Sequence, residues 1–267
     1  MPWSFTSSGN PGGFSGASSG NPGGMVAVPQ ITTAGLVINL DAGNRASYPG
    51  SGTTWTDLTG NSRNATLING PTFNSANGGS ILFTSASSHY ADIANTANST
   101  FDFANTTFTV DVWFNFTSLT FNRMLVTKAL DVGGWAVYGG LNGQIFVGAK
   151  NGTTGGYPLN WFSGNSLLNS NTWYNLTSII TTNTTTVASN TAKVYLNGVE
   201  IPGTNSPTTA EAYGGEPAVP IKIGRRSPAA SPFYMDGRIA AVKIYNRGLT
   251  AGEVFKNYIS LRDRFGI

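Results

Sequence analysis

Hydrophobic and polar residues alternate with a period of two along much of the chain. In the segment 108–114 the apolar side chains fall on one face, and they are Phe108, Val110, Val112 and Phe114. Residues 174–180 repeat the pattern with Tyr174, Leu176 and Ile180. Successive side chains of a β-strand point to opposite faces of a sheet. These runs therefore predict strands with one face on a hydrophobic core.

Two Asn-Gly pairs mark the turns between such runs. Asn142-Gly143 and Asn197-Gly198 each separate two short alternating segments. Asn-Gly favours the type I′ turn, whose twist matches two antiparallel strands, so both pairs predict hairpins. With the runs at 221–224 and 238–245, the set reaches roughly a dozen short strands, which is typical of a sandwich. The predicted fold is an all-β, antiparallel β-sandwich of the jelly-roll type.

One helix is predicted, at about residues 251–261. Thr250 is a suitable N-cap, Glu253 lies three residues later, and Leu249 can pack on Val254. This arrangement is a capping box with a hydrophobic staple. Residues 262–267 are expected to form a short tail.

Residues 1–24 have a different composition from the rest of the chain. They hold seven Gly, six Ser and three Pro, and repeat Ser-Ser-Gly-Asn-Pro-Gly-Gly at 7–13 and 18–24. This segment has too little apolar surface to offset the conformational entropy that it would lose on folding. It is therefore expected to be an extended arm. Its large side chains, Trp3, Phe5 and Phe14, are the expected anchors on a partner. The predicted division is arm 1–24, connector 25–34 and jelly-roll domain 35–267.

Composition narrows the function classes. Charged residues make up 10% of the chain, the net charge is +3, and the longest basic run is Arg225-Arg226. A nucleic-acid partner therefore has little support. The chain has no Cys, which excludes disulfides and thiolate chemistry. No apolar run approaches the ~20 residues of a membrane span, and the first residues lack a signal-peptide pattern, so no membrane partner is expected.

Six sequence motifs follow one another along the chain, at 36–41, 55–61, 108–113, 173–176, 194–198 and 233–253. In this order they resemble the laminin-G-like branch of the concanavalin A-like lectin jelly rolls. The second contains Asp57-Leu-Thr-Gly60-Asn61, and the last is the most specific. The entry loop 41–50 and the ending 263–267 also resemble laminin-G-like domains in structural proteins of tailed bacteriophages. The resemblance implies a β-sandwich and, in some relatives, glycan binding, Ca²⁺ binding or glycoside hydrolysis.

A hydrolase needs two carboxylates that face the sugar. The four glutamates are Glu200, Glu211, Glu216 and Glu253, and none has a second carboxylate two to four residues away on a plausible strand. Asp111 stands alone in its strand, and His89, the only histidine, is expected at the surface. We therefore predict a non-enzymatic protein without a catalytic residue.

Three aspartates are candidates for metal binding. Asp41, Asp57 and Asp131 are potential Ca²⁺ ligands at the rim of a sandwich. The sequence Asp-x-x-Gly-Asn equally forms an Asx turn with Gly at positive φ, which is the preferred interpretation. No metal and no cofactor is predicted.

Aromatic side chains in the segment 151–165 are the candidate glycan contacts. Tyr157, Trp161 and Phe162 lie there among Gly, Thr and Asn. Aromatic rings stack on the apolar faces of sugars, and binding residues gather on loops at a sandwich rim. In the alternative, Trp161 and Phe162 fold back on the sandwich edge or become buried against a neighbouring subunit.

Two functions remain, with hydrolysis as a minor third. The leading prediction is a structural protein of a virus particle, a phage capsid decoration (cement) protein at the capsid surface or on the tail. Its arm would dock on the major capsid protein or other virion subunits, with avidity from many copies or a homotrimer. The alternative is a carbohydrate-binding lectin module that recognises host glycans.

Overall fold

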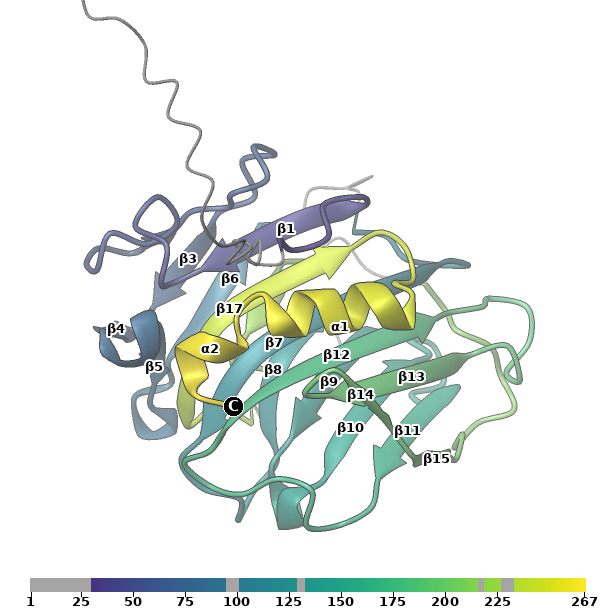
Figure 1. Ribbon diagram of the computed structural model, residues 1–267. Coiled ribbons are helices and arrows are strands. Elements are labelled where there is room, and N and C mark those ends of the chain that lie inside the picture. Colours follow the sequence, from purple (N-terminus) through teal and green to yellow (C-terminus); the bar gives the residue numbers. More distant parts are fainter. Residues whose placement is uncertain (1–29, 95–100, 129–132, 216–218, 227–232) are drawn as a thin grey trace, which may run out of the picture.

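Two antiparallel sheets lie face to face in a computed structural model that describes residues 30–94, 101–128, 133–215, 219–226 and 233–267 (Figure 1). The strands of the first sheet are β1 (Leu36–Asp41), β4 (Thr72–Asn74), β5 (Ser80–Phe83), β7 (Thr107–Phe116), β12 (Trp173–Thr181), β13 (Thr191–Leu196), β14 (Val199–Ile201) and β17 (Gly237–Tyr245). Their order is β14-β13-β12-β7-β17-β5-β4, and β1 pairs with β17.

The second sheet has more strands than the first. Its strands are β2 (Thr54–Trp55), β3 (Ala65–Ile68), β6 (Tyr90–Ile93), β8 (Arg123–Lys128), β9 (Gly134–Gly139), β10 (Ile145–Lys150), β11 (Leu159–Ser163), β15 (Gly203–Asn205) and β16 (Ile221–Ile223). Their order is β15-β11-β10-β9-β8-β16-β6-β3-β2. Three short 3-10 turns occur at Ala76–Gly78, Ser85–Ser87 and Leu141–Gly143. The predicted all-β sandwich is confirmed.

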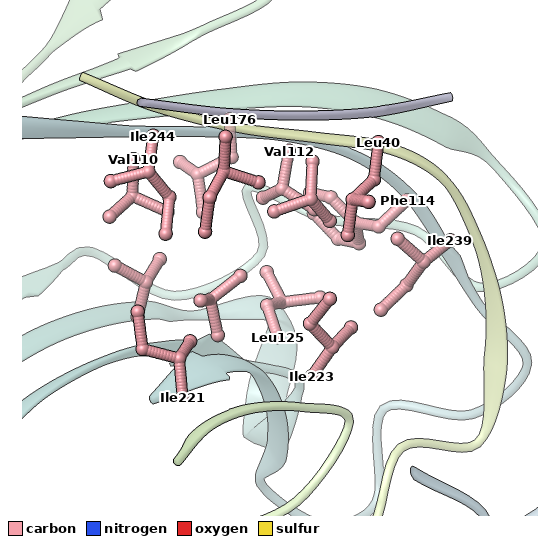
Figure 2. Close-up of a cluster of buried hydrophobic side chains, with 14 of the residues drawn as sticks. Leu40, Val110, Val112, Phe114, Leu125, Leu176, Ile221, Ile223, Ile239 and Ile244 are labelled. Carbon is pink, nitrogen blue, oxygen red and sulfur yellow. The ribbon is translucent and has the colours of Figure 1, made fainter. Parts of the chain in front are cut away.

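The core fills the space between the two sheets, as the alternation predicts (Figure 2). Strand β7 sends Val110, Val112 and Phe114 inward from the first sheet, and β8 and β16 supply Leu125 and Ile223 from the second. All five side chains are fully buried. The opposite side of each strand is left for other contacts, which differ between the two sheets.

Both predicted hairpins are present, with different turns. Asn197 and Gly198 have φ of 51° and 77° and join the directly paired Leu196 and Val199, so this is the expected two-residue turn. The hairpin of β9 and β10 instead closes through residues 140–144, with the 3-10 turn at its tip.

Two helices cover the outer face of the first sheet (Figure 1). Helix α1 (Ala251–Ile259) begins at Thr250 with the predicted capping box. The expected tail contains helix α2 (Arg262–Phe265) instead. The ring of Phe265 stacks on Trp113 with centroids 4.3 Å apart and lies 4.6 Å from Trp173. The tryptophans on the outer face of the sheet need an apolar cover. The sequence of residues 262–267 alone does not indicate that this segment provides it.

The described part of the chain begins beside helix α1. The Thr32 N–H donates to Asn257 Oδ1 at 2.8 Å, and Tyr245 Oη donates to the Thr32 carbonyl at 3.0 Å. These buried bonds fix where the connector meets the domain. The arm 1–24, with Trp3, Phe5 and Phe14, lies outside the described residues. Within the described ranges, each helix is too short or too polar to cross a bilayer.

Candidate functional site

Three aromatic side chains cross neighbouring strands on the outer face of the second sheet. Phe146 on β10 is paired with Tyr138 on β9 and with Phe162 on β11. The side chains at 145, 147 and 161 point to the core, so strand alternation places 138, 146 and 162 on the opposite face. We call Tyr138, Phe146 and Phe162 the aromatic row.

The rings of the aromatic row touch one another and stay partly exposed. Tyr138 and Phe146 are nearly parallel, with centroids 5.0 Å apart and an interplanar angle of 7°. Phe162 is tilted by 38° at 6.4 Å from Phe146. It is the end ring of the row, and its neighbour on β15 is the exposed Thr204. The Phe162 ring therefore offers a flat surface with the Thr204 hydroxyl group on the neighbouring strand.

Tyr157 reaches the same face from the loop that precedes β11. A Cβ on Gly148 would lie 3.5 Å from the Tyr157 ring, at ordinary van der Waals distance, so the ring lies over this part of β10. Tyr138, Tyr157 and Phe233 pack around Met124 and the small Ala136.

Burial, reinforced by Tyr157, raises the pKa of Tyr138 to about 12, while Arg226 acts in the opposite direction. The Tyr138 hydroxyl therefore stays protonated, and remains a hydrogen-bond donor, to a higher pH than an ordinary tyrosine.

Cationic side chains stack on further aromatic rings of this region. The Arg225 guanidinium lies 4.8 Å from the Tyr90 ring centroid and 5.5 Å from that of Tyr234. Arg226 lies 5.6 Å from the Phe233 ring. Phe233 belongs to the Met124 cluster, so the stacked arginines adjoin the aromatic row.

The structure brings two of the three predicted glycan contacts, Tyr157 and Phe162, to one face. The prediction for Trp161 needs correction, because its side chain is only 5% exposed and belongs to the core. It is the residue next to Phe162 on a strand, so the two must point to opposite faces. Of the two residues that the alternative folds back on the sandwich edge, Trp161 is buried and Phe162 is not. Tyr138 and Phe146 were missed, although both lie at alternating positions of the predicted Asn142-Gly143 hairpin.

Two of the acidic side chains singled out in the sequence, Asp57 and Asp41, have structural partners. Asp57 Oδ1 accepts from the N–H groups of Asn39 and Thr59, and Gly60 has φ of 80°, which is the preferred Asx turn. Asp41 accepts from Arg264 Nη1 at 2.7 Å. Asp131 lies outside the described residues. Across the described ranges, no group of three or more His, Cys, Asp or Glu side chains is placed to hold a metal ion.

His89 is buried rather than at the surface, being 9% exposed. Its Nδ1 accepts the N–H of Thr84 at 3.1 Å, which closes the loop before β6. That bond gives the histidine a structural role.

Cavities of the described chain lie away from this face. One of about 460 Å³ sits beside the start of helix α1 and includes Thr181, Lys193 and Glu200 in its lining. Another, also about 460 Å³, lies at a rim of the sandwich and includes Asn142 and Asn169. Neither contains a residue of the aromatic row.

The architecture is that of the concanavalin A-like sandwiches. Residues 85–255 match the laminin-G-like family described as the concanavalin A-like lectin/glucanases superfamily. The match covers more than half of the sequence, and the chain belongs to this family. No curated protein matches the chain at a significant level.

Three solved structures illustrate the likeness of fold. The binding domain of Paraclostridial Mosquitocidal Protein 1 is 19% identical with a TM-score of 0.58, over 84% of this chain and 52% of that one. A botulinum neurotoxin type C structure, whose description reports that cell entry depends on two ganglioside molecules, is 13% identical with a TM-score of 0.59, over 85% and 51%. The chain thus spans about half the length of these two toxin structures.

The third is domain 4 of AbnA, an extracellular GH43 arabinanase from Geobacillus stearothermophilus, in complex with arabinotriose. It is 16% identical with a TM-score of 0.53, over 84% of this chain and 98% of that domain. At such low sequence identities the likeness concerns the fold alone. A shared fold does not imply a shared function.

Proposed function

We propose that this protein is a non-catalytic, lectin-like carbohydrate-binding module whose ligand lies on the outer face of the second sheet. The observation that carries the proposal is the aromatic row with the adjacent Tyr157. Glycan sites combine apolar ring surface, which packs on the C–H face of a sugar, with a few polar groups that bind its hydroxyls. Phe162 and Phe146 provide the ring surface, and Tyr138 and Thr204, paired with them on the adjoining strands, supply hydroxyl groups.

The neighbouring structures support this class of ligand. One is described with gangliosides and another with arabinotriose. Both describe other proteins, so they support a carbohydrate ligand without defining which glycan this chain binds.

The bonding of the carboxylates supports a binding rather than a hydrolytic role. Glycoside hydrolysis needs a carboxyl pair about 5–10 Å apart with the sugar between them. On the outer face of the second sheet, Asp92 is held by Lys222 Nζ at 2.6 Å. Asp111 lies on the first sheet under helix α1, where Lys243 binds it. Glu253 lies at the start of helix α1, where Arg247 binds it.

A glycan array probed with the full chain tests the proposal. Phe162→Ala is expected to lower binding up to about tenfold by removing the end ring, the scale of one lost aromatic contact. Phe255→Ala is the matched control, since Phe255 is 48% exposed on helix α1, over the other sheet. The proposal fails if no glycan binds the wild-type chain, or if both variants bind as it does.

A virion decoration role is the second candidate, and the composition of residues 1–24 favours it. The arm, with Trp3, Phe5 and Phe14, would dock on a major capsid protein or another virion subunit, and a homotrimer would add avidity. None of the relatives named above is a virion protein. Deletion of residues 1–24 should abolish loading on particles while leaving glycan binding intact. Normal loading of the truncated chain would exclude the docking arm.

A further inference from the structure

Arg225 has two aromatic partners and, among the described residues, no anionic partner. Its guanidinium contacts the Tyr90 and Tyr234 rings, whose own centroids are 6.3 Å apart. Within the described part of the chain it donates no hydrogen bond, and its Nε is buried without an acceptor. A guanidinium is a planar fork of N–H donors that matches a carboxylate in two parallel hydrogen bonds. Arg225 therefore retains unused donor capacity.

The carboxylates near Arg225 are bonded to other groups. Lys222 Nζ lies 5.0 Å from the Tyr90 ring and is neutralised by Asp92. Arg226 stacks on Phe233 nearby. Asp236, the other carboxylate close in sequence, accepts from the Ser85 N–H. Both acidic groups are thus bonded to groups other than Arg225.

Stacking also prepares Arg225 for binding. Contact with two neighbouring rings restricts the guanidinium, so less rotamer freedom is lost when a ligand binds. The apolar rings lower the local dielectric, which strengthens an ion pair formed at the outer edge of the fork. The unpartnered donors and the positive charge of Arg225 itself favour an anion at this point.

The position of Arg225 links it to the aromatic row. Its partner Tyr234 is anchored by Arg123 Nη1, which donates to the Tyr234 carbonyl at 3.1 Å. The preceding Phe233 carbonyl accepts the Met124 N–H at 3.0 Å, and Met124 is the residue paired with Tyr138. The arginine and the row therefore belong to one continuous surface.

We propose that Arg225 forms an anion subsite that selects glycans carrying a carboxylate, with the neutral part of the glycan on the aromatic row. This rests on the proposed function and specifies its ligand class as acidic saccharides. Arg225 binds the carboxylate through its outer donors, while Tyr90 and Tyr234 hold the guanidinium in place. Carboxylate is favoured over sulfate because its planar pair of oxygens fits the fork in a bidentate manner.

The test compares matched ligands on the full chain by isothermal titration calorimetry. The probes are sialyllactose against lactose, trigalacturonic acid against its methyl ester, and a sulfated lactose. Wild type is expected to bind at least one carboxylated probe about tenfold tighter than its neutral partner, the scale of a charge-assisted hydrogen bond. Added salt should reduce this preference.

Arg225→Gln should remove the preference while leaving neutral binding intact, and Arg225→Lys should restore only part of it, because an ammonium lacks the fork. Arg262→Gln, on the exposed side of helix α2, is the matched control and should behave as wild type. Equal melting temperatures establish that the variants are folded. An unchanged preference in Arg225→Gln, or tighter binding of the sulfated probe, overturns the carboxylate subsite.

The two proposals fail in different ways. Binding of neutral glycans that depends on Phe162 but shows no preference for acids refutes the anion subsite alone. Absence of binding to every probe and to the whole array refutes the proposed function and the subsite with it.

Discussion

Lys243 and Asp111 form an ion pair between neighbouring strands on the covered face of the first sheet. The two residues are directly paired across β17 and β7, and Lys243 Nζ donates to Asp111 Oδ1 at 3.0 Å. Their side chains are 2% and 0% exposed. Asp111 Oδ2 also accepts from Thr177 Oγ1 at 2.8 Å and from Asn175 Nδ2 at 3.3 Å. The carboxylate is thus neutralised and well hydrogen-bonded in a site closed to water.

Removing one member of this pair should be costly. Lys243→Met leaves Asp111 charged and buried, and we expect a loss of about 3–5 kcal/mol in the free energy of unfolding. Adding Asp111→Asn removes the stranded charge and keeps an acceptor for Thr177, so the double variant should recover part of that loss. Urea denaturation measures both. A double variant no more stable than Lys243→Met would contradict this account.

Acid should weaken the start of helix α1 through Glu253. Hydrogen bonds from Arg247, together with the Thr250 N–H, lower the pKa of Glu253 to about 2. Because the folded pKa lies below the ordinary value of 4.5, the contribution to stability is complete above that value and lost as the pH falls towards 2. Glu253→Gln should therefore flatten the decline in melting temperature between about pH 4.5 and 2. The control is Glu211→Gln, at an exposed loop position; an identical decline in both variants would refute the prediction.

The inward position of Trp161 depends on Gly203. A Cβ on Gly203 would lie 2.1 Å from the Trp161 ring, so Gly203→Ala must displace the indole or the edge strand β15. We expect a loss of about 1–3 kcal/mol from this overpacking. Gly164→Ala is the matched control, because a Cβ there meets nothing within 4 Å. Thermal unfolding followed by tryptophan fluorescence distinguishes the two, and equal stability would argue against the observed packing.

Period-two patterns predicted the sandwich because burial of one strand face dictates them. The segment 108–114 and the Asn197-Gly198 turn illustrate this, and the capping box at Thr250 and Glu253 fixed the start of the helix in the same way. Such signals are local, so the residues that carry them suffice. Helix α2 had no comparable signal, since Phe265 is ordered by Trp113 and Trp173, which are distant in sequence.

The candidate site was only partly predictable for a similar reason. Tyr157 and Phe162 were found through aromatic content, but that criterion cannot distinguish Phe162 from the adjacent Trp161, which faces the core. Strand alternation makes the distinction once the pairing of β10 and β11 is known. The approach of Arg225 to Tyr90 and Tyr234 joins three separate segments, and no sequence spacing reports it.

Chemical-shift mapping with a glycan identified on the array tests the central claim most directly. Titration of the isotope-labelled full chain should perturb the aromatic resonances of Tyr138, Phe146 and Phe162 at saturation. Signals near Lys193 and Glu200, in the cavity beside helix α1, should stay unchanged. The opposite pattern, with shifts confined to that cavity and the aromatic row unaffected, would contradict a glycan site on the second sheet.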